Sequence, residues 1–389
     1  MPSPPYHIPH ISHPVKISFS VTNCICFDQR VMKMAGVVKE LGYDVTIIGR
    51  RRRACCETDN VPFRTIRFRM IFNKGFLFYK SFNIRLFFYL LFHRFDILVA
   101  NDLDTLLPNY LVSKLRRLPL VYDSHEYFTG VPELNGRPFV KWVWTSIEKF
   151  VFPDLKHVIT VSDSIADLYH KQYGIMPVVI RNLSPSSQSV IPYRKDELNI
   201  MDGSLMLILQ GGGINIDRGA EELLEAVRIT EKVFLIIAGS GDVIPELRAR
   251  VLNYGLSDRI KFFSSRPWNE LMRLTKSADA GVCLEKDTSL NYRFCLPNKL
   301  FDYISAGIPV ISGNLPEISK IISSCDCGII IPEINRQEIS RAIIKLRDNP
   351  DLLRNLKQNS VKASGFLNWE NEKTKVALLY SRVLNLKAH

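Results

Sequence analysis

A lysine and an aspartate lie near the start of a predicted helix that is otherwise apolar. The helix opens at Pro297-Asn298-Lys299, carries Asp302 one turn later and ends at Gly307. The first turn of a helix presents unpaired N–H groups and the positive end of the helix dipole, and both favour an anion. Lys299 adds a full positive charge at the same place. The spacing therefore predicts a phosphate-binding site in which Pro297, Asn298 and Lys299 take part.

A glycine-rich turn provides a second candidate for phosphate binding. The segment QGGGINIDRG, residues 210–219, joins a predicted buried strand to a predicted helix and carries Arg218 just before the helix. Glycines allow the backbone to approach a diphosphate closely. The segment IAGSGD, residues 237–242, repeats the arrangement of glycines. An ordinary tight turn remains the alternative for both segments, with Arg218 as a surface arginine in the first. The glycines predicted to take part in phosphate binding are Gly211, Gly212, Gly213, Gly239 and Gly241.

Asp302 is predicted to bind the ribose of a nucleotide. A carboxylate accepts hydrogen bonds from both ribose hydroxyls in dinucleotide-binding folds. The alternatives are that Asp302 is only a first-turn acid favoured by the helix dipole, and that Lys299 is a solvated lysine. We take Arg218, Lys299 and Asp302 as catalytic candidates as well as nucleotide-binding residues.

His125 and Glu126 follow the predicted strand LPLVYDSHE, residues 118–126. A histidine at a strand end can bind a sugar hydroxyl or move a proton, so His125 is also a catalytic candidate, although a structural role is the alternative. Asp102 and Asp104 have the spacing of a metal motif, but their context does not support one, and no metal is expected. The predicted acceptor-side residues all follow strands: Asn23, Asp28, Asp102, His125 and Glu126.

Short apolar strands alternate with amphipathic helices along nearly the whole chain. Predicted strands at 15–21, 95–102, 118–126 and 157–163 precede a Ser-, Pro- and charge-rich segment at 184–203, and further strands follow at 205–212, 233–241, 260–265, 278–285 and 308–313. This alternation predicts an α/β fold with two Rossmann-like, doubly wound parallel-sheet domains. Ligands of such sheets bind beyond the carboxyl ends of the strands. We expect one domain at 1–185 and another at 186–365.

The composition indicates a globular protein with a basic surface. Of the 389 residues, 46% are hydrophobic and 23% are charged, and the net charge is +12. A basic balance suits nucleic acid, an anionic membrane surface or phosphate-bearing substrates. No nucleic-acid-binding module is visible, so no specific nucleic-acid partner is expected. Eight dispersed cysteines and the lack of a signal-peptide pattern favour reduced thiols and a cytoplasmic location.

One stretch combines basic and aromatic residues. Residues 64–95 carry Arg64, Arg67, Arg69, Lys74 and other bases among many aromatics, and charged residues interrupt the apolar run that would otherwise suggest a membrane span. Such a stretch can rest on the cytoplasmic face of an anionic membrane and reach a lipid-linked acceptor, and residues 142–152 can add to that surface. The alternative is that these aromatics fill the core around a helix.

The ordered motifs resemble those of retaining, nucleotide-sugar-dependent glycosyltransferases of family 4, which have the GT-B fold. The matching segments are FDQRVMKMAGVVKELGYDVTIIG, ANDLDTLLP, VYDSHEYF, VITVSDSIADLY, VIRN, QGGGINIDRGAEELLEA, LPNKLFDYISAGIPVI and NWENEKTKVALLYSRVL. The resemblance implies two Rossmann-like domains facing across a cleft, an acceptor-binding domain at 1–185 and a nucleotide-sugar-binding domain at 186–365. It also implies that a helix within 366–389 crosses back to the first domain.

The chain departs from the family pattern at two positions. The family's lysine maps to Arg218, which keeps the charge, but the arginine five residues earlier maps to Gly213. The second of the family's paired glutamates maps to Asp302, whereas the first maps to Phe294. We expect Lys299 to supply part of the missing charge and Glu285 to replace the missing acidic contact to the donor sugar.

The resemblance implies transfer of a sugar from a nucleoside-diphosphate sugar to an acceptor hydroxyl, with retention of configuration. We expect a role in cell-surface polysaccharide or glycoconjugate synthesis, a saccharide or lipid-linked acceptor and no cofactor. One alternative is a sugar-nucleotide epimerase, although a dense set of acids and histidines beside the glycine-rich turn is lacking. Another is a non-catalytic protein that keeps the GT-B fold and binds a nucleotide sugar, which the changes at Gly213 and Phe294 favour.

Overall fold

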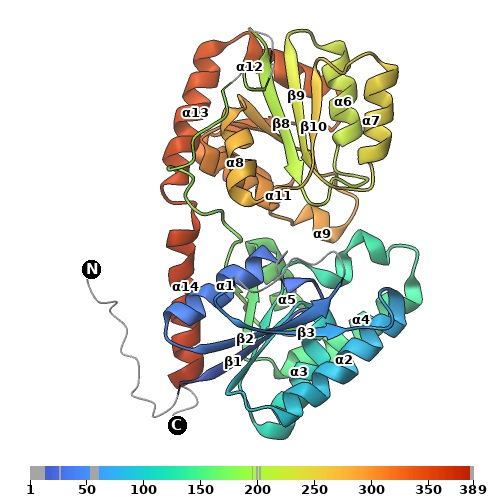
Figure 1. The fold of residues 1–389 in the computed structure, drawn as a ribbon, viewed down its shortest axis with the longest axis vertical. Coiled ribbons are helices and arrows are strands. Elements are labelled where there is room, and N and C mark those ends of the chain that lie inside the picture. Colours follow the sequence, from blue (N-terminus) through green and yellow to red (C-terminus); the bar gives the residue numbers. More distant parts are fainter. Residues whose placement is uncertain are drawn as a thin grey trace. The chain divides into compact units, whose positions relative to one another are not determined.

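The chain divides into two units, each built on its own parallel sheet (Figure 1). The computed structural model describes residues 14–25, 28–52, 61–194, 196–198, 200 and 203–385. Unit 1 comprises Met1–Arg181 and Glu372–His389, and unit 2 comprises Asn182–Asn371. The prediction of two Rossmann-like parallel-sheet α/β domains is confirmed.

Unit 1 contains a seven-stranded parallel sheet in the order β3-β2-β1-β4-β5-β6-β7. The strands are short and mostly buried, as expected for a sheet covered on both faces. The chain order reverses between β1 and β4, and polar residues follow the carboxyl ends of the strands there. The strands are β1 (Lys16–Ser20), β2 (Asp44–Arg51), β3 (Arg64–Arg69), β4 (Ile97–Asn101), β5 (Leu120–Asp123), β6 (His157–Thr160) and β7 (Val178–Val179).

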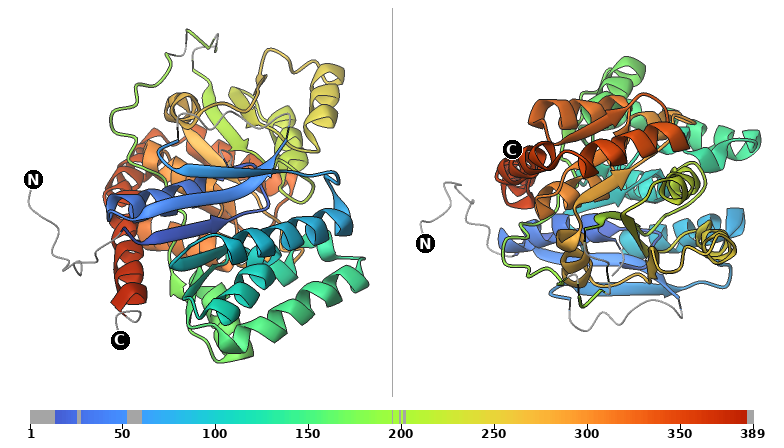
Figure 2. Two further views of the ribbon diagram at one scale, coloured as in Figure 1. Left: turned by 60° about the horizontal axis from the view of Figure 1, so that its bottom comes forward. Right: turned by 90° about the horizontal axis from the view of Figure 1, so that it is seen from above.

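Three helices of unit 1 lie side by side along one face of this sheet: α2, α3 and α4 (Figures 1 and 2). In α2 every fourth residue from Phe78 to Leu90 is buried, which gives the helix one face toward the sheet. The helices of the unit are α1 (Gln29–Glu40), α2 (Gly75–Phe92), α3 (Leu103–Arg116), α4 (Pro138–Val151), α5 (Asp163–Tyr173) and most of α14 (Trp369–Asn385).

The C-terminal helix α14 joins unit 1 from Glu372 onward. The ring of Tyr380 lies 6.2 Å from that of Phe19 on β1, and both side chains are fully buried. The carboxylate of Glu372 accepts a hydrogen bond of 2.7 Å from the backbone N–H of Arg181. These contacts attach the end of the chain to the first unit.

Unit 2 contains a six-stranded parallel sheet in the order β10-β9-β8-β11-β12-β13. Its strands are β8 (Leu205–Gly211), β9 (Val233–Gly239), β10 (Ile260–Phe263), β11 (Ala280–Cys283), β12 (Val310–Gly313) and β13 (Gly328–Ile331). Its helices are α6 (Ala220–Ile229), α7 (Ile244–Asn253), α8 (Trp268–Ser277), α9 (Leu290–Arg293), α10 (Asn298–Ala306), α11 (Pro316–Cys325), α12 (Arg336–Arg347) and α13 (Pro350–Ser364).

The central strand β8 contributes to two hydrophobic cores, one on each face of the sheet. Leu205, Leu207 and Leu209 pack with residues of α6, α7 and α12, whereas Met206 and Ile208 pack with residues of α8, α10 and α11. Successive side chains of a strand point to opposite faces, so a continuous apolar run is what a sheet covered on both sides requires. This packing fixes the carboxyl end of β8, where the glycine-rich turn begins.

The cysteines differ from the expectation in one respect. Cys283, Cys295, Cys325 and Cys327 have free thiols, as predicted. Cys24 is disulfide-bonded, so the prediction of reduced thiols is wrong for this residue. Cys26, Cys55 and Cys56 lie outside the described residues.

Candidate functional site

The glycine-rich turn after β8 is a closely packed structure with one open side. A Cβ on Gly239 would lie 1.9 Å from the carbonyl oxygen of Gly211, and one on Gly241 would lie 2.0 Å from that of Ile214. Packing therefore explains why these two positions of the second turn are glycines. A Cβ on Gly212 would meet no heavy atom within 4 Å, and one on Gly213 would meet only the side-chain amide of Asn215, at 3.8 Å. Gly212 and Gly213 thus present backbone to open space.

Lys299 extends from the first turn of α10 toward this turn. Its Cε lies 3.9 Å from the position that a Cβ on Gly211 would occupy. The side chain is only 7% exposed, and its Nζ lies 2.9 Å from Oε1 of Glu285. The sequence-based alternative of a solvated lysine is therefore inconsistent with the structure. The N-cap of α10 is Pro297, and the side chain of Asn298 accepts a hydrogen bond from Asn182.

Arg218 reaches the same carboxylate from the glycine-rich turn. Its Nη1 lies 3.7 Å from Oε1 of Glu285, and its guanidinium lies 5.0 Å from the ring centroid of the buried Tyr292. A guanidinium over an aromatic face gains a cation–π interaction. The structure thus brings Arg218 and Lys299 together beside Gly211. In the sequence, these residues belong to separate motifs.

Glu285 lies between the two cations, in surroundings that the sequence did not predict. Its side chain is not exposed, and its Oε2 accepts a hydrogen bond of 3.0 Å from the thiol of Cys283. Burial alone raises the pKa of this carboxyl, but Lys299 and Arg218 outweigh burial and hold the pKa below its usual value. Glu285 is therefore an ionised, buried group that contacts the candidate phosphate ligands.

Asp302 is the centre of a separate hydrogen-bond network in unit 2. Its Oδ1 accepts hydrogen bonds from Ser184 Oγ at 2.5 Å and Trp268 Nε1 at 3.2 Å, and its Oδ2 accepts one from Gln210 Nε2 at 2.9 Å. A carboxylate has about four acceptor positions, so three of them hold the side chain in place. Sequence reasoning missed Trp268, which forms part of no recognisable motif, and it assigned no role to Gln210, although this residue begins the glycine-rich segment.

In unit 1, His125 lies between two aspartates. Its backbone N–H donates to Asp102 Oδ1 at 2.8 Å, its Nδ1 lies 3.3 Å from Asp102 Oδ2, and its Nε2 lies 3.6 Å from Asp123 Oδ2. Asp102 precedes α3 with a φ of 59°, a conformation that is uncommon for a residue other than glycine. The structure therefore places two predicted acceptor-side residues, Asp102 and His125, in direct contact.

Electrostatics favour a protonated His125. Burial lowers the pKa of the imidazole, but Asp102 and Asp123 outweigh burial and raise the pKa to about 10. Burial raises the pKa of Asp102 itself to about 8, so Asp123, which Arg30 keeps ionised, is the counter-charge of the imidazolium at neutral pH. The pKa of Asp123 is lowered, because Arg30 and His125 outweigh the effect of burial. At neutral pH His125 is thus an imidazolium, which donates hydrogen bonds and carries positive charge.

Arg30 and Asp123 form a buried ion pair that sequence reasoning missed. The guanidinium Nη2 lies 2.7 Å from Asp123 Oδ1, and both side chains are at most 4% exposed. Arg30 Nη1 also donates to the carbonyl of Ile180 at 2.9 Å. The sequence feature that could have revealed this pair is Arg30 itself, a basic residue next to Val31 on the otherwise apolar face of α1.

The other acceptor-side candidates have local structural roles. The carboxylate of Asp28 caps α1 by accepting from the N–H of Val31 at 3.1 Å. The carbonyl of Asn23 accepts from the N–H of Arg50, and the carbonyl of Glu126 accepts from Ser124 Oγ at 2.7 Å. The side chain of Asn23 is exposed, and Glu126 is half-buried.

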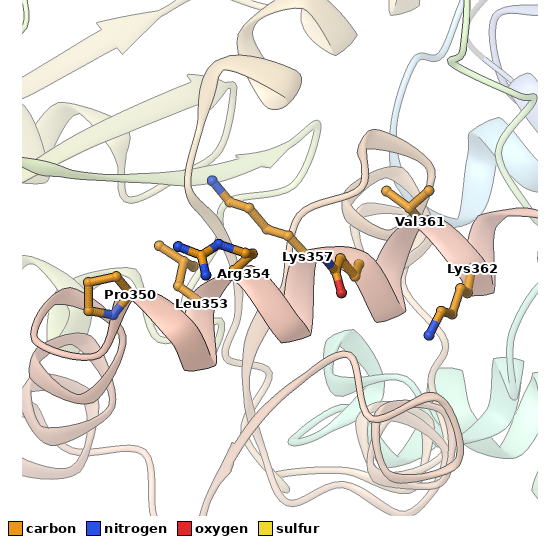
Figure 3. A pocket seen from close by; sticks show the side chains of 7 residues that line it. Pro350, Leu353, Arg354, Lys357, Val361 and Lys362 are labelled. Carbon is orange, nitrogen blue, oxygen red and sulfur yellow. The ribbon is translucent and has the colours of Figure 1, made fainter.

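A hollow on α13 lacks the features of a catalytic site (Figure 3). All its lining residues come from this one helix, and Lys357 and Arg354 are ion-paired with Asp279 and Asp351. No candidate donor or acceptor residue lines it. The lining residues are Pro350, Leu353, Arg354, Lys357, Gln358, Val361 and Lys362.

Two structural features are absent from the described part of the chain. Among residues 14–385, apart from the undescribed gaps, no group of three or more His, Cys, Asp or Glu side chains has the arrangement of a metal site. Within the same residues no helix has both the length and the apolar character needed to cross a membrane.

Comparisons with known proteins agree with the fold and the motifs. The model of the glycosyl transferases group 1 matches residues 201–363, and that of glycosyltransferase family 4 matches residues 29–183. The chitobiosyldiphosphodolichol β-mannosyltransferase of Candida glabrata is 21% identical over 67% of this chain and 64% of its own length, so the chain spans just under two thirds of that relative.

Solved structures with little sequence identity share the architecture. The sucrose-phosphate synthase of Thermosynechococcus elongatus has a TM-score of 0.76 and 17% identity, covering 96% of this chain and 100% of its own. The HepE protein of Anabaena, in complex with UDP and glucose, has a TM-score of 0.75 and 16% identity, covering 95% and 100%. At these identities the likeness shows the fold.

Proposed function

The chain belongs to the glycosyltransferases of the group 1 and family 4 type, and on that premise we propose that it transfers a sugar from a nucleoside-diphosphate sugar to an acceptor hydroxyl. The observation that carries this proposal is the convergence of Lys299 and Arg218 on Glu285 beside Gly211. Two cations, the open backbone of Gly212 and Gly213 and the start of α10 form a site suited to a diphosphate.

The chemistry requires stabilisation of the leaving diphosphate. Negative charge develops on the diphosphate as the bond to the sugar breaks, and groups fixed in advance stabilise it best. Lys299, Arg218 and the N–H groups at the start of α10 supply this stabilisation without a metal ion. His125, as an imidazolium between Asp102 and Asp123, contributes positive charge on the acceptor side rather than removing a proton. We propose that the sugar keeps its anomeric configuration, as the family resemblance implies.

A thermal-shift screen tests the donor class. Purified protein is heated with UDP, GDP, ADP, CMP and their common sugar conjugates in the presence of EDTA. A ligand that binds only the folded state raises its stability according to its concentration and affinity. We expect one nucleoside diphosphate to raise the Tm, and Lys299→Met to abolish that shift. A panel in which no nucleotide changes the Tm would contradict the proposal.

A non-catalytic nucleotide-sugar-binding protein is the second candidate. Gly213 and Phe294 replace family residues of the donor site, and this observation favours the alternative. The two functions differ in turnover: a transferase releases the nucleoside diphosphate from its sugar conjugate in the presence of acceptor or water, whereas a binding protein retains the intact conjugate.

The acceptor is proposed to be a saccharide, free or lipid-linked, reached from the cytoplasmic face of a membrane. This proposal is supported by the exposed surface of the helices α2, α3 and α4. Residues 61–95 contain no acidic residue. The stretch both fills the core, through Phe78 and Phe82, and exposes aromatics. The aromatic side chains at least 60% exposed on this surface are Phe76, Phe92, Phe139, Trp142 and Phe150.

Exposed aromatic rings among basic residues suit the interface of an anionic bilayer. The name of the Candida glabrata relative, which describes a dolichol-linked saccharide, is consistent with this proposal.

The test is co-sedimentation with phosphatidylglycerol vesicles and with phosphatidylcholine vesicles. We expect binding to the anionic vesicles only, weakened by salt and by Phe139→Ser with Trp142→Ser. The matched control is Leu252→Ser, at a residue of unit 2 that is 70% exposed. An equal loss of vesicle binding in Leu252→Ser, or no binding of the wild-type protein to anionic vesicles, would contradict membrane contact.

A further inference from the structure

We propose that Glu285 is a positioning residue that holds Lys299 and Arg218 in place for the diphosphate and is replaced by the diphosphate as the partner of their charges. The inference rests on the proposed function, since it assigns a role within the same site. It replaces the expectation that Glu285 contacts the donor sugar.

The backbone of Glu285 is fixed against the glycine-rich turn. The N–H of Lys286 donates to the carbonyl of Asp217 at 2.9 Å, and Lys286 Nζ pairs with Glu222 of α6 at 2.7 Å. A Cβ on Gly219 would lie 2.4 Å from Cβ of Leu284. The segment after β11 and the segment that carries Arg218 therefore keep one relative position.

One carboxylate oxygen serves two cations from different elements. Oε1 of Glu285 lies 2.9 Å from Lys299 Nζ and 3.7 Å from Arg218 Nη1. Lysine and arginine side chains lose much rotamer freedom when they are ordered. Glu285 orders both cations before a ligand arrives, which lowers the entropic cost of binding, but its charge also competes with the diphosphate for them, and we expect this competition to have the larger effect on affinity.

The other carboxylate oxygen is not available to a sugar. Oε2 accepts the hydrogen bond from Cys283 Sγ at 3.0 Å, and the Glu285 side chain has no exposed surface. A donor-sugar ligand needs an accessible acceptor, which Glu285 lacks. Its contacts are instead those of a group that acts on substrate through Lys299 and Arg218.

A positioning role for Glu285 predicts a specific effect when its charge is removed. Two cations and one carboxylate leave a net charge of +1 in the cluster, and Glu285→Gln raises it to +2 while keeping the side-chain volume. The variant leaves Lys299, only 7% exposed, without its ionised partner. A bound diphosphate then restores a counter-charge, so the unliganded state loses more stability than the liganded state.

The test measures the Tm and the affinity for the nucleoside diphosphate that shifts wild-type protein. We expect Glu285→Gln to lower the Tm of the unliganded protein, to bind the diphosphate about tenfold more tightly, and to turn over the sugar conjugate at least about tenfold more slowly. Glu285→Asp keeps the charge and is expected to restore most of the wild-type affinity. The control Glu225→Gln breaks a different ion pair of α6, with Arg228, that does not contact the Glu285 segment, and is expected to leave the affinity unchanged.

Three results would overturn the inference. Weaker diphosphate binding in Glu285→Gln would indicate a merely structural role. Unchanged diphosphate binding with weaker binding of the sugar conjugate would make Glu285 a sugar ligand. A wild-type protein that binds no nucleoside diphosphate refutes the proposed function itself, and the inference with it, whereas the first two results leave the proposed function intact.

Discussion

His125 and Asp102 make two contacts with each other, a backbone hydrogen bond of 2.8 Å and an imidazole–carboxylate approach of 3.3 Å. The two residues follow different strands of unit 1, β5 and β4. Asp123, on the other side of the ring, is ionised by Arg30. His125 is thereby held as a cation in the unit that the family resemblance assigns to the acceptor.

The charge of His125 predicts a particular pH dependence. The folded pKa of about 10 exceeds the unfolded value of 6.5. The stability that the imidazolium contributes is therefore complete below pH 6.5 and is lost as pH rises through about 10. We expect the Tm difference between wild type and His125→Gln to be largest near pH 6 and to shrink toward pH 10. An imidazole that titrates near pH 6.5 by NMR would contradict this assignment.

Glu148 of α4 predicts a loss of stability in the same direction but at lower pH. It is buried, its Oε1 accepts from Tyr173 Oη at 2.7 Å, and burial raises its pKa from 4.5 to about 7. Wild-type protein should lose stability as pH rises from 4.5 to 7, by at most about 3 kcal/mol. Glu148→Gln has no carboxyl and does not undergo this loss. In urea denaturation, the free energy of unfolding of the variant relative to wild type should therefore increase up to pH 7 and stay constant above it. Parallel curves for the two proteins would exclude the effect.

The Arg30–Asp123 pair should be costly to break and much less costly to replace. Asp123→Asn leaves a buried guanidinium without its charge partner, so we expect a loss of about 3–5 kcal/mol in the free energy of unfolding. The double variant Arg30→Met with Asp123→Asn should recover a large part of that loss. A double variant as unstable as the sum of both single variants would show that the two residues do not act as a pair.

Gly213 offers a gain-of-function test of the family alignment. Its Cβ direction is open, so an arginine there should not disturb the fold. We expect Gly213→Arg to bind the nucleoside diphosphate about tenfold more tightly, as one added charged hydrogen bond allows. Gly213→Gln controls for size, and Gly241→Ala, whose Cβ would lie 2.0 Å from a carbonyl oxygen, should destabilise unit 2. Equal affinities of wild type and Gly213→Arg would place this position outside the diphosphate site.

The sequence predicted those features that depend on neighbouring residues. Strand–helix alternation identified the two sheets, and local motifs identified the glycine-rich turn, Lys299 and the strand end at His125. Pairings between distant residues were not predictable, because the order of strands determines them. Arg30 and Asp123 are an example, since they meet only when β1, β4 and β5 become neighbours.

Glu285 illustrates a second limit of sequence reasoning. Its position after a strand suggested a place in the donor site, and the structure places it beside Lys299 and Arg218, but the residue type alone did not distinguish a sugar ligand from a partner of cations. That distinction depends on burial and on the direction of Lys299 from another helix. Ser184 likewise belongs to the segment expected as a linker, yet it is buried against Asp302.

The most direct test of the central claim is the rate at which the protein releases nucleoside diphosphate from the sugar conjugate that stabilises it, measured in EDTA for wild type and Lys299→Met. We expect turnover that EDTA does not reduce, and a rate at least about 100-fold lower in Lys299→Met, which should retain its folding transition. Turnover that EDTA abolishes, or that is equal in Lys299→Met, would contradict metal-independent stabilisation of the diphosphate by Lys299.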